Sequence, residues 1–342
     1  MMKHAKLAAA VSLALALAAC GGSSSAPAAA PAAPAPVVAP PPPPPPPPAS
    51  DLQTSVAAAT YAPGSQELAF FTGVNDFRGK VGLGLLAQSA KLDKSSANHL
   101  AYVLANADVD FAALDANGMP LFHSEDPARP GYTGKTVVDR VNFAQYASVY
   151  VGEEGGFGSG KGAIATLNSF VDSVYHRAAL MAQSPRDIGV AVGSNAAQTL
   201  VVNFGYETKL QYNASNYFGS YPADKQTGVR LIAGGEAPNP FPGVAYSDYA
   251  TKTSYPINVV SAAFTTLAVT TFTVTEAGAT APLDVRQLNA STSAQDKTFL
   301  AANTAFIVGR APFKANTTYN VSFVGTVNGA AVSKVWSFTT GS

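Results

Sequence analysis

The side chains that could carry out chemistry are few in this sequence of 342 residues. After residue 20 it contains three histidines, His99, His123 and His176. A neutral imidazole can bind a divalent metal ion or act as a general base. Ser173 stands three residues before His176, a spacing that could pair a nucleophile with its base. His99 shares a helical face with Val103, and we expect it to be a buried structural histidine.

Other chemistries have little support in the sequence. Cys20 is the single cysteine, which excludes an intramolecular disulfide, a cysteine-based metal site and a cysteine nucleophile. Neither a Gly-x-Ser-x-Gly elbow nor a His-Glu-x-x-His helix is present. The glycine-rich segment 155–162 lacks a Gly-Lys-Ser/Thr ending, so we expect a flexible cleft rim and not a phosphate loop. These patterns favour binding over catalysis.

The N-terminus has the pattern of an exported bacterial lipoprotein. Basic residues precede an apolar segment over 7–17, and the motif Leu-Ala-Ala-Cys at 17–20 resembles a lipobox. This resemblance implies a lipoprotein signal peptide over 1–19, cleavage before Cys20 and lipidation of Cys20. Several acyl chains would then hold the protein in a bilayer stably. No aspartate follows Cys20, which favours the outer membrane if the cell has two membranes.

Residues 20–50 are expected to join the lipidated cysteine to the folded part. They form a Pro/Ala-rich linker with an unbroken proline run over 40–48. This composition favours a polyproline II spacer without a core of its own. Lys and Arg together number 21, as do Asp and Glu. Because no net charge attracts nucleic acid, we expect none to bind.

Local patterns after the linker predict two folded parts. Apolar residues recur at helical spacing over 66–77, 92–105 and 166–181. Short β-branched runs follow at 188–193 and 199–205. Helices before paired strands indicate an α+β fold for 51–212. The Tyr/Pro/Gly-rich segment 213–254 is expected to be a packed connector, and alternating strands predict an all-β sandwich over 255–342.

Several segments in one order also carry a family resemblance. They are 92–103 with Ala97-Asn98-His99, 122–127 beginning Phe122-His123, 138–141, Val151-Gly152-Glu153, 170–181 with Ser173-Val174-Tyr175-His176-Arg177, and Ile188-Gly189-Val190-Ala191. Together they resemble the bacterial branch of the CAP superfamily (SCP/PR-1-like domains), which includes plant pathogenesis-related and cysteine-rich secretory proteins. Glu154 stands where the family usually has Asn, and Phe170 replaces a usual Trp.

The CAP resemblance implies an α-β-α sandwich whose cleft contains His123, Glu153 and His176. Two neutral imidazoles and the Glu153 carboxylate are a possible ligand set for zinc, with a fourth position left for water. The alternative is a hydrogen-bonded cluster that binds no metal. The sequence leaves both interpretations open.

The resemblance assigns two further residues to the cleft. Ser173 stands where many eukaryotic members have a second glutamate, so the complete set of two histidines and two glutamates is absent. Arg177, directly after His176, could pair with Asp139 or with a cleft carboxylate, or it could be a charge on the helix surface. We take Ser173 and Arg177 as candidate ligand-binding residues.

The C-terminal strand over 336–340, Trp-Ser-Phe-Thr-Thr, resembles the closing strand of bacterial immunoglobulin-like modules and implies such a domain over 255–342. We therefore expect a membrane-tethered protein of the cell envelope. Its His/Glu cleft would bind a small apolar molecule, a peptide or an envelope component. The alternative is a metal-dependent hydrolase that acts on envelope polymer or peptide. The identity of the ligand or partner is left open.

Overall fold

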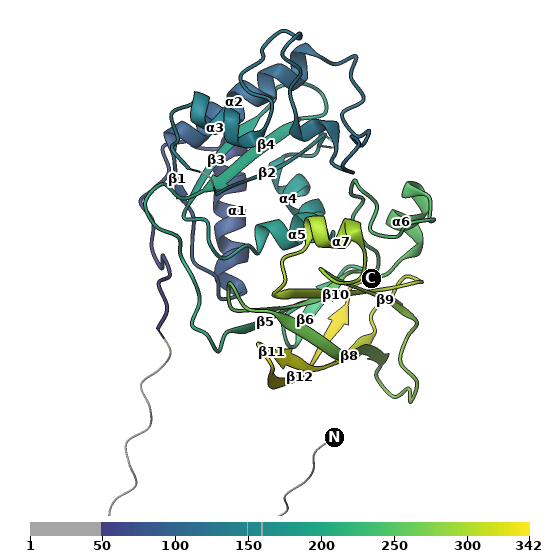
Figure 1. Ribbon diagram of the computed structural model, residues 1–342. Helices are drawn as coiled ribbons and strands as arrows, with labels where there is room; N and C mark the ends of the chain where they lie inside the picture. The colour runs from purple at the N-terminus through teal and green to yellow at the C-terminus, as the bar shows by residue number, and fades with distance from the viewer. Residues whose placement is uncertain (1–48, 149, 159) are drawn as a thin grey trace, which may run out of the picture. The chain divides into compact units, whose positions relative to one another are not determined.

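The computed structural model describes residues 49–148, 150–158 and 160–342 (Figure 1). The predicted signal peptide, Cys20 and most of the predicted linker lie outside these residues. The described chain belongs to one compact unit, Pro47–Ser342, and combines helices with three four-stranded sheets. This confirms the predicted mixed helix and sheet class. In the described ranges, no helix is both long and apolar enough to cross a membrane.

The N-terminal part is one sheet with helices on both faces. In spatial order its strands are β1 (Ala87–Gln88), β3 (Asp187–Val192), β4 (Leu200–Gly205) and β2 (Val151–Gly156). β1 runs parallel to β3, and the other neighbours are antiparallel. Its helices are α1 (Gln66–Lys80), α2 (Ala90–Ala105), the 3-10 turn η1 (Leu121–His123), α3 (Val137–Phe143), α4 (Ala163–Val171) and α5 (Tyr175–Leu180).

The alternation of side chains along β4 shows how the layers form. Leu200 packs in a core shared with α1 and α4, whereas its neighbour Val201 packs with Leu100 of α2 on the other face. On that second face α2 lies very close to β3, because a Cβ atom at Gly189 would be 2.0 Å from the backbone carbon of Leu92. The sheet is therefore the middle layer of an α-β-α arrangement (Figure 1).

The helix predicted over 166–181 is in fact two helices, α4 and α5, separated by residues 172–174. The break has a tertiary cause. The carboxylate of Glu236 accepts hydrogen bonds from the backbone N–H groups of Val174 at 2.7 Å and Tyr175 at 2.8 Å. These N–H groups therefore donate to a side chain, as at a helix N-terminus, and a new helix begins at Tyr175.

The C-terminal part consists of two four-stranded sheets. The first contains, in spatial order, β5 (Phe218–Tyr221), β7 (Ile257–Ser261), β10 (Thr304–Gly309) and β9 (Val285–Asn289). The second contains β6 (Gln226–Val229), β12 (Ala330–Thr340), β11 (Thr318–Val327) and β8 (Leu267–Glu276). Side chains of both sheets share one apolar core that includes Ile307, Phe272 and Trp336. The part is thus a β-sandwich, while its immunoglobulin-like character stays a prediction.

The segment 213–254 differs from the predicted connector. It contains β5, β6 and helix α6 (Tyr246–Lys252), and both strands belong to the sandwich. β5 pairs antiparallel with β7, and β6 pairs parallel with β12. The local sequence is rich in Gly, Pro and Asn and has little strand propensity, so the regular structure comes from pairing with distant strands. Helix α7 (Ala294–Phe299) lies between β9 and β10 in the chain.

Candidate functional site

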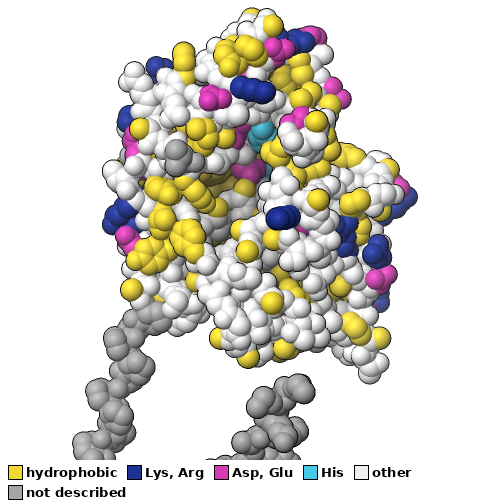
Figure 2. All heavy atoms as spheres, in the orientation of Figure 1, with side chains coloured by type: hydrophobic (Ala, Val, Ile, Leu, Met, Phe, Trp, Pro, Cys, Tyr) yellow, Lys and Arg dark blue, Asp and Glu magenta, His cyan; other side chains and the backbone are white. Residues whose placement is uncertain are grey.

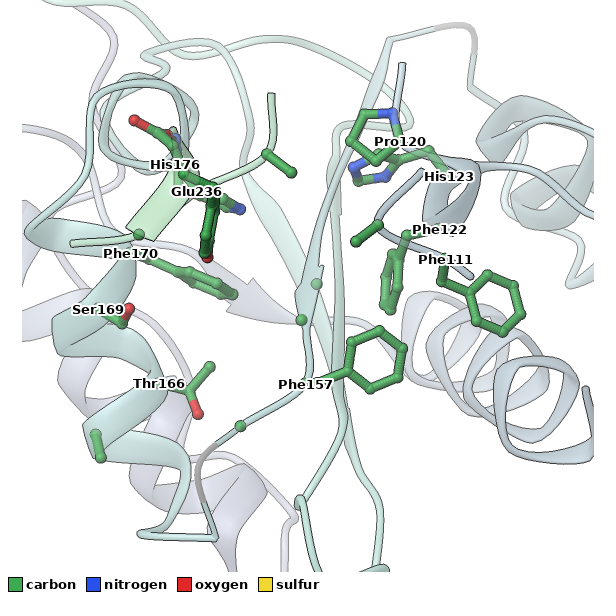
Figure 3. A pocket seen from close by; sticks show the side chains of 18 residues that line it. Phe111, Pro120, Phe122, His123, Phe157, Thr166, Ser169, Phe170, His176 and Glu236 are labelled. Atoms are coloured by element: carbon green, nitrogen blue, oxygen red, sulfur yellow. Dashed lines mark hydrogen bonds and ion pairs between the residues drawn. The ribbon is translucent and has the colours of Figure 1, made fainter. Parts of the chain in front are cut away.

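A cavity of about 330 Å³ opens beside strand β2, with His123 in one wall and His176 in the opposite wall (Figure 3). Five aromatic side chains also line it: Phe111, Phe122, Phe157, Phe170 and Tyr246. The space-filling view shows histidine atoms in a hollow of the surface, with apolar and acidic side chains beside them (Figure 2). The structure therefore brings the two predicted histidines to one cavity, from segments more than fifty residues apart.

Glycines of β2 make room for the aromatic walls. A Cβ atom at Gly155 would lie 2.1 Å from the ring of Phe122, so a side chain there would collide with that ring. A Cβ atom at Gly156 would lie 3.6 Å from the ring of Phe170, which is ordinary contact. The segment predicted as a flexible rim thus begins inside a strand, and its first glycines form part of the cavity surface.

Glu153 lies at the centre of a charged network behind His123. Its carboxylate accepts hydrogen bonds from the Arg140 guanidinium at 2.6 Å and from the Asn203 amide at 3.0 Å. Nδ1 of His123 lies 3.2 Å from Oε1 of Glu153. Burial raises the pKa of Glu153, but its interactions with His99 and Arg140 outweigh burial and hold this pKa well below its usual range. Glu153 is thus a buried carboxylate that orients His123.

His99 fixes the loop that carries His123. Its Nδ1 lies 2.9 Å from Glu125, and its Nε2 lies 2.7 Å from the carbonyl oxygen of Phe122. The side chain is fully buried, as its helical face predicts. Glu125 in turn accepts the backbone N–H of Gly134 at 3.1 Å. His99 therefore acts through the backbone beside His123 and does not line the cavity.

His176 contacts two other carboxylates, Glu154 and Glu236. Its Nε2 lies 3.6 Å from Oε2 of Glu154, and its Nδ1 lies 3.3 Å from Oε2 of Glu236. The imidazole also stacks on Phe170, with ring centroids 4.6 Å apart and an interplanar angle of 2°. Glu153, the predicted partner, faces the opposite side of β2, because successive residues of a strand point to opposite faces. His123 and His176 therefore belong to two separate clusters.

In the second cluster the pKa values of Glu154 and His176 are both raised. Burial, with the negative charges of Glu236 and Glu153, raises the pKa of Glu154 to about 8, although His176 opposes this rise. Burial lowers the pKa of His176, but the carboxylates of Glu154 and Glu236 outweigh burial and raise it above its usual value. At pH 7 Glu154 is consequently protonated.

Sequence reasoning missed Glu236. This residue lies in the predicted connector, sixty residues after His176, and is buried. One signal was available, since Glu236 is the only charged residue between Arg230 and Asp248 in a stretch rich in Gly and Pro. A lone carboxylate in such a segment indicates a specific partner.

Ser173 and Arg177 are buried and do not line the cavity, although the Ser173 hydroxyl lies 3.3 Å from Nδ1 of His176, as their spacing in the sequence predicts. The Ser173 hydroxyl is fully buried, donates to the Phe170 carbonyl at 2.9 Å, and is not part of the cavity surface. Its buried position and bonded hydroxyl provide no accessible nucleophile. Arg177 is also fully buried and donates to the Pro256 carbonyl at 2.7 Å. The proposed pairing of Arg177 with Asp139 does not occur, because the Asp139 carboxylate caps the N-terminus of α3.

The predicted zinc ligands do not form one donor set. A divalent cation bound to Glu153 would lie beside the guanidinium of Arg140, which already occupies that carboxylate. In the part of the chain that the structure describes, no group of three His, Cys, Asp or Glu side chains is placed to hold a metal ion. Each histidine lies against a carboxylate that orients its ring, and such an arrangement suits hydrogen bonding to a ligand.

Comparison with known proteins gives partial structural likenesses. Neither a protein-family model nor a curated protein matches the chain. An extracellular protein with an SCP domain from Bacillus anthracis is 19% identical over 41% of this chain, with a TM-score of 0.33. The chain spans only 39% of that protein. An outer surface protein from Borrelia burgdorferi is 17% identical, with 43% of this chain and 97% of that chain covered and a TM-score of 0.34. The CAP assignment therefore stays a prediction.

Proposed function

We propose that this chain is a lipid-anchored protein of the cell envelope whose CAP-like domain binds a small, largely apolar ligand in the cavity beside β2. The cavity itself carries this proposal. Its volume of about 330 Å³ and its aromatic walls are those of a small-molecule site, in which a few polar groups orient an apolar ligand. The ligand is a small apolar molecule, or the apolar side chain of a peptide or an envelope component.

The two histidines supply the polar recognition. Each has a nitrogen beside a buried carboxylate, Glu153 for His123 and Glu236 for His176. These contacts hold the rings in one orientation, which lowers the conformational entropy lost when a ligand binds. His176 lines the cavity and can donate an imidazole N–H to a ligand oxygen. A ligand with an oxygen-containing end and an apolar body could accept a hydrogen bond from a histidine and pack against the aromatic side chains.

A substitution that fills the cavity tests the proposal. Gly156→Val places a side chain against Phe170 in the cavity, where a Cβ atom meets only ordinary contacts. Gly152→Ala is the matched control, since Gly152 is in the same strand but does not line the cavity, and its Cβ would lie 4.0 Å from Phe204. The neutral fluorescent probe N-phenyl-1-naphthylamine is titrated into the purified full chain and both variants.

We expect the probe to bind the wild type and the Gly152→Ala variant equally, and the Gly156→Val variant about tenfold more weakly, as loss of space for one or two methyl groups implies. Circular dichroism checks that both variants are folded. Equal binding by all three proteins would place the probe elsewhere and contradict the proposed site. Absence of binding to the wild type would contradict an apolar ligand site of this size.

The anchor has a separate test, because Cys20 lies outside the described residues. Cells that express the full chain are grown with labelled palmitate, and the wild type is expected to carry the label and to fractionate with membranes. Cys20→Ser should lose both properties. Labelling of the Cys20→Ser variant would show that this motif is not the site of lipidation.

A further inference from the structure

Helix α5 has three consecutive residues that contact different parts of the molecule. His176 lines the cavity, whereas Tyr175 and Arg177 on either side of it contact the C-terminal sandwich. The helix has only six residues, Tyr175–Leu180. So short a helix is not stable in isolation, because helix nucleation is unfavourable and few backbone hydrogen bonds follow it. The position of His176 therefore depends on what the rest of α5 packs against.

Tyr175 connects α5 to helix α7. Its hydroxyl donates to the carboxylate of Asp296 at 2.7 Å, and both residues are buried. Asp296 also accepts a hydrogen bond from Arg286 of β9 at 3.1 Å. The Tyr175 ring belongs to an apolar cluster with Leu288 and Phe306 of the sandwich. The hydroxyl and the ring of Tyr175 thus bind α5 to helix α7 and to strands β9 and β10.

Arg177 makes a second connection, to strand β7. Its guanidinium donates to the Pro256 carbonyl at 2.7 Å and to the side-chain oxygen of Asn258 at 3.1 Å. The same group lies 4.7 Å from the ring centroid of Tyr255 and 4.9 Å from that of Tyr221. A guanidinium over the face of an aromatic ring is attracted to it, and the attraction is stronger when both are buried. Arg177 is fully buried, so these contacts fix its direction.

Glu236 makes the third connection and is the one that contacts the imidazole directly. It accepts the backbone N–H groups of Val174 and Tyr175, approaches Nδ1 of His176 at 3.3 Å, and accepts from the Tyr249 hydroxyl at 3.4 Å. The segment that carries it lies between strands β6 and β7 of the sandwich. The sandwich therefore supplies a wall of the cavity as well as supports for α5.

We propose that Tyr175, Arg177 and Glu236 are positioning residues through which the β-sandwich holds the His176 imidazole in the cavity wall. The sandwich is then a working part of the ligand site and not a separate module joined to it. This inference deepens the proposed function, on which it rests for the ligand. The placement of His176 can, however, be measured without any ligand.

Nuclear magnetic resonance of the histidine ring protons in the full chain tests this inference. The Phe170 ring stacks on His176, so the His176 signals carry a ring-current shift that reports on its position. Titration of the same signals gives the pKa of His176, whose facing carboxylates are Glu154 of β2 and Glu236. His123 lies in the opposite wall and provides an internal reference.

Glu236→Gln keeps the shape of the side chain and removes its charge. We expect the pKa of His176 to fall by about 1, as the loss of one adjacent carboxylate implies, and the His123 signals to stay unchanged. Arg177→Lys and Tyr175→Phe leave the charges around His176 in place, and we expect both to reduce its ring-current shift. Glu276→Gln is the control for the first variant, because Glu276 pairs with Lys314 at the surface far along the chain.

A purely structural role gives a different result. If Arg177→Lys and Tyr175→Phe lower only the melting temperature and leave the His176 shift at the wild-type value, and Glu236→Gln leaves its pKa unchanged, the proposal is wrong. Should Arg177→Lys fail to fold, the other two variants decide. A moved His176 signal in a protein that binds no N-phenyl-1-naphthylamine would support this inference and contradict the ligand site. Probe binding with an unmoved signal would do the reverse.

Discussion

The two faces of strand β2 each carry a buried glutamate, and the pKa values of these two glutamates are shifted in opposite directions. On one face Glu153 meets Arg140 at 2.6 Å and two histidines. On the other face the adjacent Glu154 meets His176 at 3.6 Å and is near a second carboxylate, Glu236. The pKa of Glu153 is far below its usual range, and that of Glu154 is about 8. Both side chains are buried, so burial alone does not decide the charge of a carboxylate.

The difference lies in the neighbouring charges. A guanidinium stays charged when buried and stabilises the ionised carboxylate beside it. Beside Glu154, His176 lowers the pKa, but burial and the carboxylates of Glu236 and Glu153 outweigh it. The first cluster is consequently a fixed ion-pair network, and the second can change its protonation near neutral pH. The second cluster is also the one that the sandwich helps to build, through Glu236.

The largest contrast is expected in stability. Glu153→Gln removes the carboxylate that lies nearest to the buried guanidinium of Arg140 and should lower the free energy of unfolding by about 3 kcal/mol. Glu154→Gln should not lower it at pH 7, because the folded state keeps Glu154 neutral there whereas the unfolded chain ionises it. Urea denaturation measures both values. Glu207→Gln, at a surface pair with Lys91, is the control. Equal losses for Glu153→Gln and Glu154→Gln would mean that the two faces do not differ in charge.

The two faces should also respond to pH in opposite directions. The folded state raises the pKa of Glu154 from 4.5 to about 8, so its contribution to stability is complete below pH 4.5 and is lost as the pH rises to about 8. The raised pKa of His176 acts in the same direction above 6.5. Glu153 contributes above pH 4.5 and loses its contribution in acid.

The measurement is the free energy of unfolding of the wild type and each glutamine variant between pH 3.5 and 8.5. Relative to the wild type, Glu154→Gln should gain more than about 1.4 kcal/mol between pH 5 and 8, since one pKa unit corresponds to that energy. The deficit of Glu153→Gln should shrink only below pH 4.5. A Glu154→Gln curve parallel to the wild type would show that the pKa of Glu154 is not raised.

Zinc gives the smallest expected effect. His123 and His176 belong to different clusters, and Arg140 occupies the carboxylate that was predicted as the third ligand. Isothermal titration of zinc at pH 7 should therefore show no more binding to the wild type than to His123→Ala or His176→Ala. Stoichiometric binding to the wild type that is absent from both variants would show that His123 and His176 bind zinc together, with a third ligand other than Glu153.

Much of the local structure could be read from the sequence. The periodicity over 92–105 predicts α2 almost to the residue, and the runs at 188–193 and 199–205 correspond to β3 and β4. The helical face of His99 predicts its burial. These features depend on residues within a few positions of each other, so local spacing contains the information.

Other features required contacts between distant residues. The break between α4 and α5 depends on Glu236, sixty-two residues after Val174. The strands β5 and β6 exist because β7 and β12 pair with them, although their own segment has little strand propensity. Arg177 looks like a surface or cleft charge in its helix, but the carbonyl and rings that surround it come from Pro256, Tyr255 and Tyr221.

The sequence by itself determined the mixed fold class, most helices and strands, and the segments that carry His123 and His176. Only the tertiary structure decided which carboxylate each histidine meets. Glu153 and Glu154 are adjacent and chemically identical in the chain, and strand alternation sends them to opposite faces. What each then encounters, a guanidinium or a second carboxylate, comes from elements far away in the sequence. Their pKa values differ for that reason, because the charge of a buried group is set by the groups packed around it.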